Sequence, residues 1–165
     1  MRAIFDELSD KSRIWIFQSS QPLVGKAEQI TQEADAFLQQ WAAHGSQLKA
    51  SCHVAYNHFL IIAIDEDFNM ASGCSIDSMT RFVQELAKKH DVELFDRTKL
   101  AFNKEGKIVL VEMNKMKTLV AEGFFTSETL FFNNNIQTKA QLNSEWLVKP
   151  EESWLNRYFA VAKSV

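Results

Sequence analysis

The chain has 165 residues, of which 46% are hydrophobic and 24% are charged, and its formal net charge at pH 7 is −3. An apolar fraction this high with so small a charge excludes a disordered chain, and the slight acidity argues against a nucleic-acid partner. The longest apolar run, residues 59–64, is far shorter than the roughly 20 residues that a membrane-spanning helix needs. We therefore expect a folded protein with no membrane span and no nucleic-acid partner.

The first half of the chain predicts strands that alternate with two long helices. Residues 1–12 are polar and lack a clear period, so we expect a flexible N-terminal leader followed by one domain over residues 13–165. Residues 13–19 are rich in β-prone side chains and predict a strand. From about Val24 or Lys26 to His44 the chain repeats apolar positions with a helical period, and Gly45 stands where a left-handed residue would end that helix.

A hairpin and a second helix follow. Residues 48–56 and 58–65 predict two strands joined by a tight turn at Asn57, and the second is apolar throughout, which is typical of a central strand. Residues 76–90 predict a helix, with Ser75 as its N-cap.

The second half predicts shorter elements. Strands are expected at residues 92–95, 100–102, 107–113 and 130–132, with a turn at Glu105 and Gly106 between the second and the third. Helices are expected at residues 114–122, 138–146 and 153–162. Adjacent strands with separate helices predict the α+β class: a single domain with a mostly antiparallel or mixed sheet packed with helices.

Small residues lead into the second long helix and suggest an anion-binding site. Ser72, Gly73, Cys74 and Ser75 would place free backbone N–H groups at the positive end of the helix dipole, and Arg81 would add a positive side chain. The same field would favour the thiolate of Cys74. The alternative is a capped helix start in which Cys74 packs as a small apolar residue.

Two amides in the second half could extend such a site. Asn133 and Asn134 follow an apolar strand and could bind a small polar ligand, although asparagine also favours loops for local hydrogen bonding.

Several kinds of chemistry lack their motifs. Neither a phosphate loop of the form Gly-x4-Gly-Lys-Ser/Thr nor a Gly-x-Gly-x-x-Gly pattern occurs, which argues against ATP hydrolysis. His44, His53 and His58 lack zinc-ligand spacing, and the acidic run at residues 65–67 is more typical of a solvated strand end than of a metal site. A Cys74 nucleophile paired with His53 or His58 stays open, because spacing does not test it. We expect no catalytic residues, no metal and no cofactor.

The cysteine usage and the C-terminal segment bear on location and partners. Cys52 and Cys74 without an export signal favour reduced thiols and a cytoplasmic protein. Aromatic and apolar side chains gather near the C-terminus, at Trp154, Leu155, Tyr158 and Phe159. This stripe predicts a helix that either docks on its own sheet or contacts a protein partner or a second copy of the chain.

A set of short motifs resembles a known pattern. The segments IWIFQS (residues 14–19), WAAHG (41–45), ASGCSID (71–77), FDR (95–97), FNN (132–134) and SW (153–154) occur in that order. In these the chain resembles a small family of uncharacterised bacterial proteins labelled "ABC transporter ATPase" or "ATP-binding component". The resemblance covers roughly residues 13–154 and implies no catalytic or binding residue, since the phosphate loop is absent. The function we expect is small-ligand or anion binding without catalysis, and the alternative is an interaction or assembly module that uses the aromatic C-terminal helix.

Overall fold

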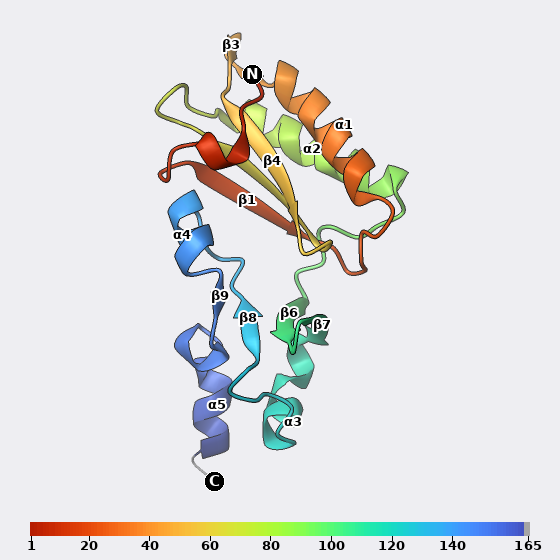
Figure 1. The fold of residues 1–165 in the computed structure, drawn as a ribbon, viewed down its shortest axis with the longest axis vertical. Helices are drawn as coiled ribbons and strands as arrows, with labels where there is room; N and C mark the ends of the chain where they lie inside the picture. Colours follow the sequence, from red (N-terminus) through yellow and green to blue (C-terminus); the bar gives the residue numbers. More distant parts are fainter. Residues whose placement is uncertain (164–165) are drawn as a thin grey trace. The chain divides into compact units, whose positions relative to one another are not determined.

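The computed structural model describes residues 1–163, which fall into two compact units (Figure 1). Unit 1 comprises Met1–Asp96 together with Gln137–Ala140, and unit 2 comprises Arg97–Ile136 and the residues from 141 onward. All strand pairs within the described ladders are antiparallel and helices pack beside them, so the predicted α+β class is confirmed. The last two residues of the predicted domain 13–165 lie outside the described residues.

The sheet of unit 1 has three strands with β5 (Phe59–Ile64) at its centre, between β1 (Arg13–Gln18) and β4 (Ala50–Ala55). Every residue of β5 is fully buried. A strand that is paired on both edges and covered on both faces is apolar throughout, so the predicted central strand is confirmed. The β4–β5 turn uses positive φ angles at Tyr56 and Asn57, 53° and 54°.

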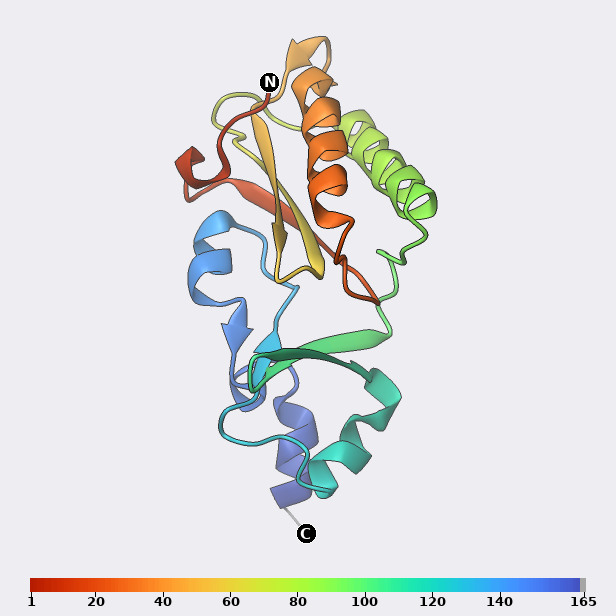
Figure 2. The same cartoon turned by 45° about the vertical axis from the view of Figure 1, so that its right-hand side comes forward.

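Two helices, α1 (Ala27–Gln40) and α2 (Gly73–Lys89), cover one face of this sheet (Figures 1 and 2). Their apolar stripes meet alternate residues of β5, as the helical period predicts. The shared core includes Ile30, Ala34 and Leu38 of α1, Met79, Val83 and Leu86 of α2, and Leu60, Ile62 and Ile64 of β5. This packing fixes where α2 begins relative to the sheet.

The first helix ends four residues before the predicted end at residue 44. Trp41 is extended (φ −69°, ψ 131°), and its indole Nε1 donates to the backbone oxygen of Ser75 at 2.8 Å. The strands β2 (Ala42–Ala43) and β3 (Ser46–Gln47) then form a small hairpin. Gly45, with φ of 79°, belongs to the turn of this hairpin and not to a helix cap, because a two-residue turn of this kind requires positive φ.

Residues 92–95, predicted as a strand, join no ladder. Val92 and Leu94 are instead buried in the core of unit 1, and the backbone oxygen of Glu93 accepts a hydrogen bond from the Ser20 amide at 3.1 Å. The apolar alternation of residues 92–95 therefore reflects the packing of Val92 and Leu94 into the core of unit 1, without pairing to another strand.

Residues 1–12, expected to be a flexible leader, pack within unit 1. They contain the short 3-10 turn η1 (Phe5–Glu7) and the buried Leu8. The amide of Ala3 donates to the oxygen of Ala50 at 2.7 Å, beside β4, and the ammonium of Lys139 donates to the oxygen of Leu8 at 2.7 Å. These contacts give the segment a defined place that its polar composition did not indicate.

Unit 2 contains an antiparallel sheet in the order β7 (Lys107–Glu112), β6 (Lys99–Lys104), β8 (Leu130–Phe132) and β9 (Leu147–Val148). Three of these strands and the turn at Glu105 and Gly106 were predicted, whereas β9 has only two residues and no sequence period. The remaining elements are η2 (Met113–Lys115), α3 (Met116–Ala121), α4 (Lys139–Ser144), η3 (Pro150–Glu152) and α5 (Asn156–Lys163).

The core of unit 2 is rich in phenylalanine. Phe102 lies near Phe131 and Phe125, with ring centroids 5.4 and 4.8 Å apart, and Leu155 and Phe159 complete the cluster. Among the helices of residues 1–163, none combines the length and the apolar character needed to cross a membrane.

Candidate functional site

The predicted site begins at the N-terminus of α2, where Ser72 and not Ser75 is the N-cap. Ser72 Oγ accepts a hydrogen bond from the Ser75 amide at 3.1 Å, and Ser75 Oγ accepts one from the Ser72 amide at 2.7 Å. This reciprocal pair is a capping box, with serine in place of the usual glutamate at the third helical position. The helix therefore starts three residues before the predicted start, and Ser75 is buried inside its first turn.

Gly73 and Cys74 occupy the first two positions of α2, and both are exposed. Helix geometry supplies no acceptor for the N–H groups at these positions, so they point out of the helix end with the positive end of its dipole. A Cβ added at Gly73 would meet nothing within 4 Å, so the chain around it does not require a glycine. Arg81 is exposed eight residues later, about 12 Å further along the axis, and so lies too far along to join these two amides.

The loop that leads into α2 is anchored by three polar side chains. Asp65 Oδ1 accepts from the Asp67 amide at 3.1 Å, and Glu66 Oε2 accepts from the Ala71 amide at 3.2 Å. Asn69 Nδ2 donates to the backbone oxygens of Ser46 and Gln47 in β3, each at 3.2 Å. Such closure of the loop on itself and on the hairpin limits its freedom before any ligand binds.

This anchored loop exposes two large apolar side chains, Phe68 at 54% and Met70 at 69%. Sequence reasoning missed both residues, since the sequence alone does not show whether an apolar side chain in a loop is buried or exposed. The available signal was their position between polar residues in a segment with no apolar period. Two large exposed apolar side chains separated by a single residue in one loop indicate a contact surface.

Carboxylates shape the electrostatics of this end of unit 1. The Glu66 carboxylate, which accepts from Ala71, lies 3.9 Å from Arg13, and that of Asp65 lies 3.9 Å from Lys49. Asp67 is exposed in the same loop. Arg13 and Lys49 offset the charges of Glu66 and Asp65, so Asp67 leaves one net negative charge among these groups, and a ligand with several negative charges would be repelled by it more than one with a single charge.

The two cysteines lie in different settings, and both are free thiols. Cys74 is exposed, whereas Cys52 is buried in β4, with Sγ 3.3 Å from Asp35 Oδ1. Burial, reinforced by the Asp35 carboxylate, raises the pKa of the Cys52 thiol to about 12. Cys52 therefore stays protonated and donates to Asp35, which Arg2 also contacts at 3.1 Å.

The histidines considered as partners for Cys74 have other neighbours. The ring of His53 lies 5.6 Å from that of Phe5, and His58 Nδ1 is 3.3 Å from the oxygen of Tyr56. Among residues 1–163, no cluster of three histidine, cysteine or carboxylate side chains could hold a metal ion.

The two predicted amides belong to unit 2 and support its local structure. Asn134 Oδ1 accepts from the indole of Trp146 at 2.9 Å, and Asn133 Oδ1 accepts from the amide of Asn135 at 3.2 Å. These hydrogen bonds fit the alternative interpretation of asparagine as a loop-stabilising residue.

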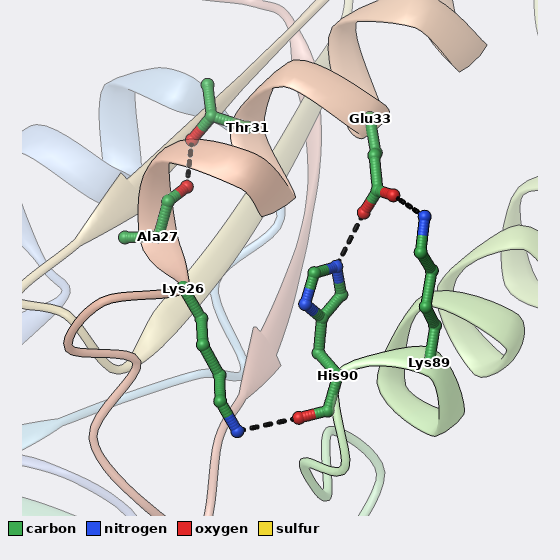
Figure 3. Close-up of polar contacts among 6 residues, drawn as sticks. All are labelled: Lys26, Ala27, Thr31, Glu33, Lys89 and His90. Carbon is green, nitrogen blue, oxygen red and sulfur yellow. Dashed lines mark hydrogen bonds and ion pairs between the residues drawn. The ribbon is translucent and has the colours of Figure 1, made fainter.

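A polar cluster that sequence reasoning missed joins α1 to the end of α2 (Figure 3). Glu33 contacts His90 Nε2 at 2.5 Å and forms an ion pair with Lys89, while Lys26 Nζ donates to the His90 oxygen at 2.7 Å. Hydrogen bonds from His90 and then Lys89 lower the pKa of the Glu33 carboxyl below its ordinary value. The cluster links two helices, and nothing in the spacing of these residues along the chain indicates it.

Comparisons with known proteins add no relative: the chain matches no protein-family model, no curated protein and no solved structure.

Proposed function

We propose that the protein is a non-catalytic binding module for a small ligand that combines one negative charge with an apolar body. The binding surface is the end of unit 1 formed by Phe68, Met70 and the first two residues of α2. In this proposal the amides of Gly73 and Cys74 bind the charged group, and the two apolar side chains contact the rest of the ligand.

The observation that carries the proposal is the exposure of Phe68 and Met70 on a loop already fixed by Asp65, Glu66 and Asn69. An ordered loop loses little conformational entropy on binding, so the apolar contact retains more of its free energy. The negative charge of the exposed Asp67 in the same loop favours a carboxylate or sulfonate over a nucleotide or another polyphosphate.

Fluorescence of 8-anilinonaphthalene-1-sulfonate, an apolar monoanion, tests the proposal in the full chain. We expect saturable binding that decanoate displaces and that decanol and ATP displace poorly. Replacing Phe68→Ser and Met70→Gln together should weaken the dye's affinity about tenfold or more, because each loses roughly 1 kcal/mol of apolar contact. The matched control is Val24→Gln, which removes an apolar side chain that is 72% exposed in the connection before α1.

Gly73→Pro isolates the role of the helix amides. Proline is favoured at the first helical position, and Ser72 already has the extended conformation (φ −99°, ψ 165°) that a residue before proline prefers. The variant should therefore fold normally, lack one N–H group, and bind decanoate several-fold more weakly with little change for decanol. Unsaturable dye binding, or equal losses in the Val24→Gln control, would contradict the proposal.

Two further expectations stay predictions: the cytoplasmic location with reduced cysteines, and the resemblance to the ABC-labelled family. The alternative function is an interaction module at the C-terminal helix. Of the four side chains expected to form its contact surface, Leu155 and Phe159 are buried in the core of unit 2 and are not available to a partner.

A further inference from the structure

The strand β7 forms an outer edge of the sheet of unit 2, because β6 is its only pairing partner among the described strands. The amide of Met113, directly after β7, donates to the oxygen of Thr98 at 2.9 Å. Since backbone direction alternates along a strand, every second residue of β7 counted back from Met113 also turns its N–H and C=O groups toward β6. The residues whose backbone groups point away from the sheet are therefore Ile108, Leu110 and Glu112.

These outward backbone groups are open along the length of the strand. Within residues 1–163 they have no hydrogen-bond partner. The strand carries charge only at its two ends, at the exposed Lys107 and Glu112, and residues 108–110 between them are apolar and half-buried. Folded proteins usually protect such an edge with charges, with proline or with a covering segment, because an unprotected edge pairs with another strand.

The other outer strands of the two larger sheets are protected in this way. On β1, the amide of Ile14 donates to the oxygen of Gln137 at 3.0 Å, so a later segment covers the start of that edge. On β4, the N-terminal segment pairs at Ala50, whose oxygen accepts from the amide of Ala3 at 2.7 Å. The strand β9 has only two residues. By contrast, β7 is six residues long, and no described segment of the chain covers it.

The open edge of β7 is complementary to itself. A two-fold axis perpendicular to the sheet at Leu110 makes two β7 strands antiparallel, so that Leu110 exchanges both backbone hydrogen bonds with Leu110 of the other copy. Ile108 then exchanges its hydrogen bonds with Glu112 of the other copy, and the positive end of each strand lies beside the negative end of the other.

This axis also matches the faces of the two sheets. Val109 and Val111 pack in the core of unit 2, and antiparallel pairing about Leu110 places Val109 of each copy opposite Val111 of the other. A two-fold axis along the strands would instead put the core face of one copy beside the opposite face of the other. The antiparallel arrangement therefore continues one apolar face from copy to copy.

From these observations we propose that β7 is a dimerisation edge, through which two copies of this chain join their unit 2 sheets into one antiparallel sheet. The occupant of the edge is an extended main chain, because only a strand presents donors and acceptors at the spacing of a strand edge. A second copy supplies this spacing together with the matching apolar face. The edge belongs to unit 2, so the proposal does not depend on the ligand-binding surface of unit 1.

Sedimentation equilibrium of the full chain from about 1 µM to 1 mM tests the pairing, and we expect a monomer–dimer equilibrium. The N–H of Leu110 points away from β6, so Leu110→Pro removes no hydrogen bond within the chain, and proline is tolerated at such edge positions. The dissociation constant should rise about tenfold or more, because the hydrogen bonds at the axis are lost. Leu110→Val is the matched control: valine is close to proline in size but keeps the N–H, so it should change the constant much less.

Leu110→Lys and Leu110→Glu test the axis itself, because only a residue on a two-fold axis meets its own copy. Each variant alone should pair about tenfold more weakly or worse, since like charges lie directly opposite each other, and an equimolar mixture of the two should recover the pairing. Circular dichroism establishes that each variant is folded, and if Leu110→Pro is not, the two charged variants decide the question.

Three results would overturn the proposal. The first is a wild-type monomer at every concentration, which leaves the edge to a different chain. The second is a dimer that a folded Leu110→Pro variant does not weaken. The third is a mixture of Leu110→Lys and Leu110→Glu that pairs no more tightly than either variant alone.

Discussion

At the scale of single residues, Glu33 shows how one carboxylate ties two helices together. It lies within α1 and contacts both Lys89 and His90 at the end of α2 (Figure 3). Its pKa is lowered in the folded protein, so its contribution to stability is present above the unfolded value of about 4.5. That contribution is lost as the pH falls from there through the lower folded pKa, because protonation removes the charge that His90 and Lys89 favour.

Glu33→Gln should therefore lower the free energy of unfolding by about 1–2 kcal/mol at pH 7 and by much less near pH 3. Urea denaturation at a series of pH values measures how the difference in unfolding free energy between the wild type and Glu33→Gln shrinks as the pH falls. Glu85→Gln is the control, since Glu85 is exposed on α2 and should give a small difference at every pH. A Glu33→Gln deficit that does not shrink with acidification would show that the carboxylate charge does not stabilise the cluster.

The exposure of Phe68 and Met70 is also a property of single residues that the sequence does not reveal. The start of α2 was recognisable because Ser72 and Gly73 are small and precede an apolar period. Whether Phe68 and Met70 point inward or outward depends on Asn69, which fixes the loop to β3 through tertiary hydrogen bonds. The candidate site was therefore predictable in its polar half and not in its apolar half.

At the scale of elements, periodicity located the helices and strands but not their ends. Trp41 continues the apolar period of α1, yet it is extended, because its indole binds the oxygen of Ser75 on α2. Ser75 looked like a cap because it precedes the apolar period, whereas the actual cap, Ser72, adds a first turn with exposed positions. The first difference arises from a contact between two elements, which a one-dimensional pattern does not contain, whereas the second arises from the local exchange of hydrogen bonds between Ser72 and Ser75.

Ser72→Ala tests the cap directly. Loss of the acceptor for the Ser75 amide should lower the free energy of unfolding by about 1 kcal/mol. Ser78→Ala, the same chemical change inside α2, should be neutral or slightly stabilising, because alanine is the better helix former there. Denaturant unfolding monitored by circular dichroism measures both variants, and equal effects at the two positions would mean that the capping box contributes nothing.

At the scale of the whole molecule, the course of the chain was the least predictable feature. Residues 137–140 belong to unit 1, although the forty residues before them belong to unit 2. The chain crosses between the units after residue 96 and after residue 136, and no Pro- or Gly-rich stretch marks either point. Such a linker is not needed where the chain is held by contacts on both sides of the crossing. The α+β class was predictable from local patterns, whereas this return depends on contacts between residues more than 130 positions apart.

Lys139 makes those long-range contacts, and its replacement tests whether unit 1 depends on them. Its side chain is buried, and its ammonium donates to the backbone oxygens of Asp6 at 2.9 Å and Leu8 at 2.7 Å. Lys139→Met keeps the apolar stem but leaves two acceptors without a donor, which should cost about 1.5–3 kcal/mol of stability. The loss should concentrate in residues 1–12, where amide hydrogen exchange measured by mass spectrometry should become faster. Lys11→Met, which changes an exposed lysine in the same segment, should leave exchange unchanged. If exchange in residues 1–12 is equally slow in all three proteins, the Lys139 side chain does not stabilise the segment, which is then held by its contacts with β4 and by the backbone hydrogen bonds from Lys139 and Ala140 to Ser12 and Asp10.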